Sequence, residues 1–309
     1  LNLVDNDFDI PLGTCGIPEF GTGFVRGMVL DTKPTAFSDL IRISGLSHGT
    51  DVWLNNAQDL ILAGTASIKE VICTRDDIML GLISMGLDAK QSFSIMEHVR
   101  KGKGLTKEEE DYMRENKVPA WYIDSCKKIK YMFPKAHAAA YVMMAFRIAY
   151  YKVYYHLAYY AKYYSIRAKE FNLEKMTNGK ETVQRAIAEI KAQGNKASNK
   201  EQQLMTSLEL ALEMYCRGFG FRKVDVYKSH YNEFKIIDHD LLPPLNAIDG
   251  LGDKAAIQIY EEALKRPFIS KEDLQTRAKV NKSNIEKLEQ FGCLNSLPDS
   301  NQMSFLGFM

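Results

Sequence analysis

The chain has 309 residues, of which 46% are hydrophobic and 26% are charged, and its formal net charge is +1. This length accommodates two domains, or three small ones, and the composition is ordinary for a globular protein. The near-zero net charge excludes a global basic field, so binding of nucleic acid would depend on local patches. The five cysteines form neither a C-x-x-C pair nor a zinc-ligand spacing, which favours free, buried thiols in a reducing cytoplasm.

Residues 1–34 are expected to form a loop-rich connection, because glycine, proline and acidic residues dominate them. Asp5, Asp7 and Asp9 alternate along the chain, and such carboxylates either hold a magnesium ion or form a solvated acidic loop. We expect no signal peptide, since Leu1–Ile10 has several aspartates and no basic start. The sequence does not open on methionine, so we expect it to be a piece of a longer chain.

The next segment predicts a short helix over Thr35–Ile43 that is capped by a glycine, and the run Arg42–Trp53 overlaps its end. Within that run, Ser47, His48 and Asp51 have the residue types of a hydrolase triad. The sequence lacks the glycine-serine-glycine turn that presents such a serine, so we assign no nucleophilic catalysis here.

A basic turn, Arg100-Lys-Gly-Lys-Gly104, follows a helix predicted over Ala89–Val99. Basic residues and glycine favour the ends of helices, so one interpretation of the turn is a helix C-cap. The same residues would also clamp a phosphate, and the spacing leaves both interpretations open. Thr106 then caps a further helix that begins near Glu108.

The stretch Tyr131–Tyr141 predicts the start of a long helix, since Pro134 is tolerated in a first turn and the alanines after it are strong helix formers. Lys135 and His137 then lie in the first turn, where unpaired N–H groups and the helix dipole disfavour a cation by about 0.3–1 kcal/mol. An anion such as phosphate would remove this misfit. The alternative is a surface lysine beside a packed histidine.

This helix is expected to run through Tyr164, and its charged residues argue against a membrane span. Two more amphipathic helices are predicted over Phe171–Gly194 and Lys200–Arg217. Alternating residues then predict a β-hairpin with strands over Arg222–Lys228 and Glu233–Asp240.

Residues 247–256 have the hydrophobic-x-Gly-hydrophobic-Gly pattern of a helix-hairpin-helix. Gly250 and Gly252 are expected to turn tightly, so that amides near Gly252 and Asp253 face a backbone phosphate and Lys254 supplies charge. A second helix-turn-helix segment, Lys271–Leu288, lacks these glycines and is expected to pack against the first. The tail from Leu297 ends in polar and then apolar residues that suit a groove on a partner, or it is an ordinary frayed end.

Several of these stretches together resemble the C-terminal part of the PolC-type alpha subunit of bacterial DNA polymerase III. The resemblance spans nearly the whole chain and includes residues 16–21, 43–53, 75–79, 99–104 and 125–141, together with the helix-hairpin-helix and the tail. It implies a mainly α fold, with a helical fingers domain over 35–217, a duplex-binding domain with a β-hairpin and tandem helix-hairpin-helix units over 218–296, and a tail over 297–309.

The resemblance also implies site residues and partners. The expected contacts to the triphosphate of a dNTP are Arg75, Arg100, Lys101, Lys103, Lys130, Lys135 and His137. Ser47, His48 and Phe133 would lie near the base or template, and the hairpin residues Gly250, Gly252, Asp253 and Lys254 on a phosphate of the primer-template. The tail resembles a peptide that binds the sliding clamp, through Gln302, Met303, Ser304, Phe305 and Leu306. Other replisome subunits are expected partners, and a membrane is not.

In this family, palm-domain aspartates that precede the segment hold catalytic Mg²⁺, and no matching motif stands in this sequence. Asp5, Asp7 and Asp9 do not match it, so we expect no catalytic or metal-binding residue in this piece and no polymerisation by it alone. Its expected share of the two-metal chemistry is positioning and charge neutralisation. The alternatives are a non-enzymatic helix-hairpin-helix adaptor that binds DNA without nucleotide, and a helical scaffold that binds neither.

Overall fold

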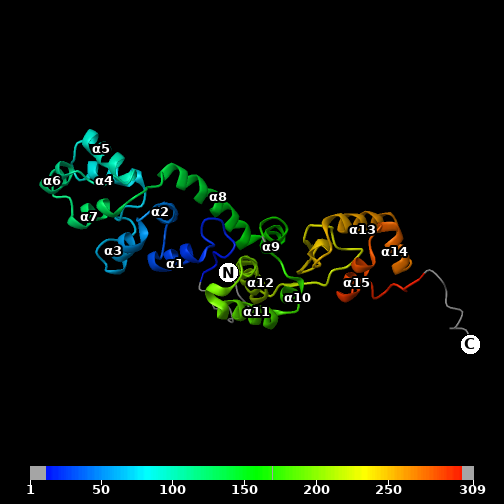
Figure 1. The fold of residues 1–309 in the computed structure, drawn as a ribbon. Helices are drawn as coiled ribbons and strands as arrows, with labels where there is room; N and C mark the ends of the chain where they lie inside the picture. The colour runs from blue at the N-terminus through cyan, green and yellow to red at the C-terminus, as the bar shows by residue number, and fades with distance from the viewer. Residues whose placement is uncertain (1–11, 169, 301–309) are drawn as a thin grey trace, which may run out of the picture. The chain divides into compact units, whose positions relative to one another are not determined.

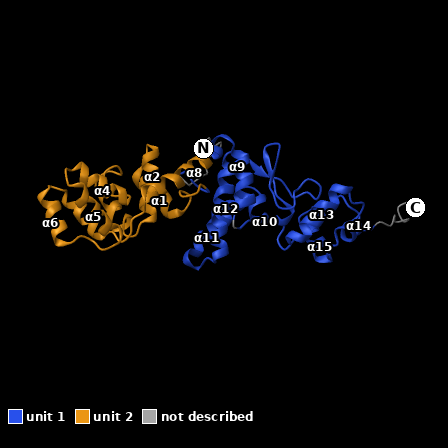
Figure 2. Cartoon of the chain, turned by 90° about the horizontal axis from the view of Figure 1, so that it is seen from above, with its two compact units in different colours: residues 1–16, 150–309 blue, residues 17–149 orange. Residues whose placement is uncertain are grey.

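The computed structural model describes residues 12–168 and 170–300. The chain divides into two compact units (Figure 2). We call residues 17–149, drawn in orange as unit 2, the first unit, and residues 150–309 together with residues 1–16, drawn in blue as unit 1, the second unit. Both are helical, and the second also contains a small sheet, which confirms the predicted mainly α fold. Among the described residues, no helix combines the length and apolarity that crossing a membrane requires.

The borders of these compact units are not those of the domains that the resemblance implies, which end at residues 34, 217 and 296, and that domain division stays a prediction. The chain passes between the units after Gly16 and again after Ala149. The second crossing lies inside one continuous helix, and composition does not reveal that a helix is shared between two units.

Eight helices account for most of the described part of the first unit (Figure 1). They are α1 (Gly23–Thr32), α2 (Phe37–His48), α3 (Gln58–Leu62), α4 (Arg75–Ser84), α5 (Ala89–Arg100), α6 (Lys107–Glu115), α7 (Ala120–Lys128) and α8 (Lys135–Tyr154). A kinked turn, η1 (Trp53–Ala57), precedes α3.

Helix α1 corrects the expectation that residues 1–34 form a loop. Thr22 caps the helix by accepting a hydrogen bond from the Val25 amide at 3.4 Å. Val25, Met28 and Val29 recur at helical spacing and are buried. The surrounding glycines obscured this short apolar stripe, whose burial stabilises the helix.

Helix α2 also differs from its prediction, because it continues through Gly45 to His48. A Cβ atom at position 45 would lie 2.6 Å from the Cys73 carbonyl oxygen. Gly45 therefore permits close packing inside a helix and does not end it.

Helix α8 begins at Lys135, directly after Pro134, as predicted, but it ends at Tyr154 and not at Tyr164. Tyr155 leaves the helical conformation, with φ −130° and ψ 54°. The helix resumes as α9 (His156–Lys162) and closes in the π-helical turn η2 (Tyr163–Arg167).

Three helices follow in the second unit: α10 (Leu173–Thr177), α11 (Lys180–Gln193) and α12 (Asn199–Cys216), with the turn η3 (Gly194–Lys196) before α12. The single helix predicted over Phe171–Gly194 is divided, because Gly179 adopts φ +95° between α10 and α11. Helices α11 and α12 pack side by side (Figure 1).

The predicted hairpin is present but is shifted along the chain. Strands β2 (Lys235–Ile237) and β3 (Asp240–Leu242) pair antiparallel, and β1 (Gly220–Phe221) pairs parallel with β3. Asp238, at φ +54°, forms the two-residue turn between β2 and β3 with His239. Residues 222–228 are therefore not a strand. The Asp225 side chain accepts hydrogen bonds from the backbone amides of Tyr227 and Lys228, which closes a turn there.

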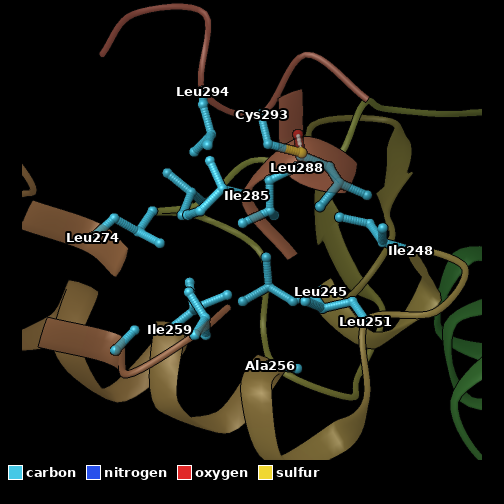
Figure 3. Close-up of a cluster of buried hydrophobic side chains, with 14 of the residues drawn as sticks. Leu245, Ile248, Leu251, Ala256, Ile259, Leu274, Ile285, Leu288, Cys293 and Leu294 are labelled. Atoms are coloured by element: carbon cyan, nitrogen blue, oxygen red, sulfur yellow. Dashed lines mark hydrogen bonds between the residues drawn. The ribbon is translucent and has the colours of Figure 1, made fainter. Parts of the chain in front are cut away.

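A compact helical module follows the sheet: the turn η4 (Leu245–Ala247), then α13 (Asp253–Lys265), α14 (Lys271–Ala278) and α15 (Lys282–Gln290). The buried side chains of these elements point into one core (Figure 3). Leu245, Ile259, Leu274 and Leu288 are fully buried in it. This core fixes the hairpin between η4 and α13 against α14 and α15.

Candidate functional site

A short segment between α7 and α8, residues 130–135, forms backbone hydrogen bonds with three distant parts of the first unit. The Thr50 amide donates to the Tyr131 carbonyl at 3.0 Å, and the Arg75 amide donates to the Phe133 carbonyl at 3.2 Å. The Met132 amide donates to the Arg100 carbonyl at 3.4 Å. Most of the predicted nucleotide-binding residues therefore lie on this segment or on loops bonded to it.

The start of α8 carries the predicted cations, and both are accessible. The Lys135 side chain is 41% exposed, and His137 lies on the surface. Neither residue points into a sealed apolar interior. This exposure is what an anion-binding role for the pair requires.

Two carboxylates from the start of α4 occupy the hydrogen-bonding groups of Lys135. Asp76 Oδ2 accepts the Lys135 backbone amide at 2.8 Å, and Asp77 Oδ1 accepts its ammonium Nζ at 3.2 Å. Asp77 Oδ2 accepts the amides of Thr74 at 2.9 Å and Cys73 at 3.3 Å, which caps α4. The expectation of a free first amide in α8 is therefore wrong, since the chain supplies its own anion there.

The basic turn after α5 divides into paired and unpaired cations. Glu97 pairs with the Arg100 guanidinium and with Lys101 Nζ, the latter at 2.7 Å. These hydrogen bonds, that of Arg100 foremost, lower the pKa of Glu97 to about 2. Within residues 12–168 and 170–300, the side chains of Arg75, Lys103 and Lys130 have no ion-pair partner.

Gly102 holds the basic turn against the 130–135 segment. Its φ is +72°, and a Cβ atom at this position would overlap the Lys130 carbonyl oxygen. Only glycine tolerates both conditions, so the turn and the segment are in close backbone contact.

Aromatic rings continue from this segment along one side of α8. His48 stacks on Phe133 with ring centroids 4.7 Å apart, Phe133 meets His137 edge-on at 5.2 Å, and His137 lies 4.7 Å from Tyr141. Ser47 Oγ donates to the Ser44 carbonyl at 3.0 Å and lies 3.0 Å from His48 Nδ1. His48 Nε2 lies 3.4 Å from Glu19 Oε2.

The site also contains residues that the sequence does not predict as its members: Glu19, Asp76, Asp77, Glu97 and Tyr141. The sequence indicates the position of Tyr141, because it follows His137 by one helical turn and therefore lies on the same side of α8. Asp76 and Asp77 lie in the first turn of α4, where acidic residues are common, so their residue type alone does not indicate a contact with Lys135. Glu19 gave no signal, since its position depends on a left-handed backbone conformation with φ +67°.

The second candidate site is the hairpin before α13. Gly250 has φ +75°, and Gly252 forms the N-cap of α13 with φ −65°. The tight turn predicted for both glycines thus holds for Gly250 alone, since the conformation of Gly252 is open to other residues. The first amides of a helix have no partner within it, so the start of α13 offers donors to a phosphate.

Lys287 of α15 contributes to this hairpin, although the sequence predicts residues 271–288 only as a packing partner. Its Nζ lies so close to Gly250 that a Cβ atom there would overlap it. Asp249, Asp253 and Lys254 are exposed beside it. Asp253 accepts a hydrogen bond from Asn246 Nδ2 at 2.9 Å. Two carboxylates balance two ammonium groups, so oriented amides rather than net charge are the distinctive feature of this surface.

Two other predicted groups lie outside the described residues: Asp5, Asp7 and Asp9, and the clamp-binding residues Gln302–Leu306. The part of the chain that the structure describes contains no group of three or more His, Cys, Asp or Glu side chains able to hold a metal ion.

Two parts of the chain match known protein families: the hairpin before α13 lies inside one match, whereas residues 130–141 lie outside both. Residues 12–118 match the bacterial DNA polymerase III alpha subunit finger domain, and residues 218–303 match the helix-hairpin-helix motif. The finger-domain match therefore covers α1 to α6 of the first unit, and the hairpin before α13 lies within the helix-hairpin-helix match.

Individual proteins with similar sequences indicate which type of DNA polymerase III the chain resembles. The chain is 58% identical over 98% of its length to the PolC-type DNA polymerase III of Caldanaerobacter subterraneus, and covers 22% of that protein. It is 56% identical over 98% of its length to the enzyme of Bacillus subtilis, and 53% identical over 99% to that of Clostridium perfringens, covering 21% of each. The resemblance to the PolC type is therefore confirmed, and the chain spans about a fifth of the length of these relatives.

Proposed function

We propose that this chain is the part of a replicative DNA polymerase that grips the incoming dNTP and the primer-template duplex during DNA synthesis in the cytoplasm. The observation that carries this proposal is the convergence of Arg75, Arg100 and Gly102 on the 130–135 segment, at the start of α8. The finger-domain match and the names of the relatives support it. A DNA-binding adaptor without nucleotide affinity would not need this cationic convergence.

In the finger region, the triphosphate contacts are Lys135 and His137 on α8, Arg75 on α4, and Lys103 and Lys130 on the adjoining loops. Arg100 and Lys101 take part less strongly, because Glu97 already neutralises them. Each charge-assisted hydrogen bond to a phosphate contributes about 1.5–3 kcal/mol. Ser47, His48 and Phe133 face the base or template, where the stacked rings of His48 and Phe133 supply an aromatic surface.

The reaction itself is in-line nucleotidyl transfer assisted by Mg²⁺, and we assign the metal ligands to the remainder of the longer protein. The residues of this chain contribute by positioning the triphosphate and by neutralising its charge. Lysine and arginine side chains fixed next to the phosphates act without reorganising during the reaction.

The helix-hairpin-helix module binds the duplex through its backbone phosphates. Gly250, Gly252, Asp253 and Lys254 present the amides and one charge, and Lys287 adds a second ammonium group from α15. Such contacts carry no base sequence, so binding is non-specific and weakens with salt, with a log–log slope of about −0.9 per phosphate neutralised.

The tail binds the sliding clamp through Gln302, Met303, Ser304, Phe305 and Leu306, and further replisome subunits join through the same assembly. The chain just before this peptide is anchored: the Lys271 amide donates to the Pro298 carbonyl at 2.9 Å, and Lys271 Nζ lies 2.6 Å from Asp299 Oδ1. The peptide therefore follows a fixed point on α14 by a few residues. Deleting residues 302–309 from the full-length protein is expected to abolish capture of the clamp.

The substitution Lys135→Ala in the full-length protein tests the central assignment. Loss of one charge-assisted hydrogen bond is expected to lower the rate of nucleotide incorporation by about ten- to hundredfold. Steady-state incorporation at varied dNTP concentration measures this effect. An unchanged rate would remove Lys135 from the nucleotide site.

A further inference from the structure

We propose that Asp77 is an internal competitor for the nucleotide: its carboxylate pairs with the Lys135 ammonium, and a phosphate that binds Lys135 must displace it. Asp76 does the same for the Lys135 amide. This inference rests on the proposed role of Lys135 in dNTP binding, and it adds an exchange of partners that weakens the binding of any phosphate ligand at this point.

The geometry of the two carboxylates supports competition. An anion at the start of α8 would accept hydrogen bonds from the Lys135 amide and from Nζ, and these are the groups that Asp76 and Asp77 already occupy at 2.8 and 3.2 Å. Both carboxylates belong to the chain, so their effective concentration at this position is high and does not vary.

Asp77 and Lys135 differ in their freedom to move. Asp77 is fixed by the amides of Thr74 and Cys73, and its side chain is only 12% exposed. The only side-chain partner of Lys135 among the described residues is Asp77, and its flexible stem is 41% exposed. A phosphate that arrives from solvent would therefore move Lys135 and leave Asp77 on the α4 cap.

The first test is Asp77→Asn in the full-length protein, with a dideoxy-terminated primer-template so that dNTP binds without reacting. Asparagine keeps a side-chain oxygen for the Thr74 amide and removes the charge that competes. The apparent Kd for the next correct dNTP is expected to fall about two- to fivefold, the range that partly exposed ion pairs contribute. Pyrophosphate, which also places phosphate groups near Lys135, should inhibit at concentrations lower by a similar factor.

Two further variants keep the test decisive. Asp76→Asn leaves the α4 cap intact and is expected to shift the dNTP Kd in the same direction. Asp88→Asn is the matched control, because Asp88 caps α5 by accepting the amides of Lys90 and Gln91 at 2.9 and 3.0 Å and does not contact Lys135. It is expected to leave nucleotide binding unchanged.

The Lys135→Ala variant distinguishes the nucleotide contact of Lys135 from the competition by Asp77. If Lys135→Ala alone leaves the dNTP Kd unchanged, both the nucleotide contact and the competition are overturned. If Lys135→Ala weakens binding while Asp77→Asn and Asp76→Asn leave it unchanged or weaken it, the contact stands and the competition is wrong. If Asp77 acts through Lys135, then Asp77→Asn has no effect on the dNTP Kd in the Lys135→Ala background. An effect that persists in this background would contradict the competition.

Discussion

The Lys152 ammonium lies 2.8 Å from Glu213 Oε2, with both side chains almost completely shielded from solvent. Lys152 also donates to the carbonyl oxygens of Gly13 and Cys15 at 2.9 and 2.6 Å. Glu213 Oε1 accepts the Tyr160 hydroxyl at 2.6 Å, and burial lowers the pKa of Lys152 despite the opposing effect of Glu213. This network joins α8 to α12 and to the chain segment that precedes the first unit.

Removing one partner of this pair is expected to destabilise the second unit strongly. Glu213→Gln leaves the Lys152 charge buried without its counter-ion, which typically costs about 3–5 kcal/mol in the free energy of unfolding. Denaturant unfolding of the chain measures the loss. Glu286→Gln is the matched control, since Glu286 pairs with Lys282 at 4.0 Å on the surface and its removal should change little. Equal effects of the two substitutions would refute the structural role of the network.

The network also explains why part of the fold was predictable and part was not. The start of α8 follows from Pro134 and the alanines beside it, which are local signals. The break at Tyr155 depends on partners far along the chain: Arg217 Nη1 donates to the Lys152 carbonyl at 3.0 Å, and Arg217 Nη2 lies 2.6 Å from His156 Nδ1. No window of sequence around Tyr155 contains those partners.

The candidate site shows the same division. The spacing of Gly250 and Gly252 identified the hairpin, because the turn is encoded within a few residues. The carboxylates at Lys135 were not predicted, since Asp76 and Asp77 lie almost sixty residues earlier and meet it only through the Arg75–Phe133 backbone contact. The sequence thus shows groups at a helix start that could bind a phosphate. Only the fold shows that a carboxylate of the same chain already occupies those groups.

The basic turn offers a matched pair of glycine substitutions. Gly102 and Gly104 have φ +72° and +71°, so alanine is strained at either position by about 1 kcal/mol. Only at Gly102 does the added Cβ also overlap the Lys130 carbonyl, while the space around Gly104 is open. Gly102→Ala is therefore expected to displace the turn from the 130–135 segment and to reduce dNTP incorporation by the full-length protein well beyond Gly104→Ala. Equal activities of the two variants would show that the close contact does not matter for the site.

The hairpin offers a second matched pair. Gly250→Ala meets a φ of +75° and displaces the Lys287 ammonium, whereas Gly252→Ala meets an accessible conformation and open space. The first substitution is expected to weaken duplex binding several-fold, and the second only slightly, because alanine is a poorer N-cap than glycine. Fluorescence anisotropy with duplex DNA at several salt concentrations measures both affinities. Stronger damage from Gly252→Ala would place the critical backbone contact at the cap of α13 and not at the preceding turn.

Alkaline pH is expected to destabilise the first unit through its buried thiol, Cys73. Burial raises the pKa of Cys73 from 9.0 to about 12, with a further contribution from the Asp77 charge. Between these two values the unfolded chain loses a proton that the folded chain keeps, so stability falls as pH rises. This thiol contributes about 1.4 kcal/mol of lost stability per pH unit above pH 9.

Thermal or denaturant unfolding of the wild-type chain and of Cys73→Ala at pH 8, 9, 10 and 11 isolates this contribution. The variant loses packing at every pH, which shifts its whole curve, but its decline above pH 9 is expected to be shallower than that of the wild type. Other buried tyrosines and thiols affect both proteins equally and cancel in the difference. Curves that stay parallel up to pH 11 would mean that the Cys73 thiol titrates alike in the folded and unfolded chains, against the fully enclosed position that the structure gives it.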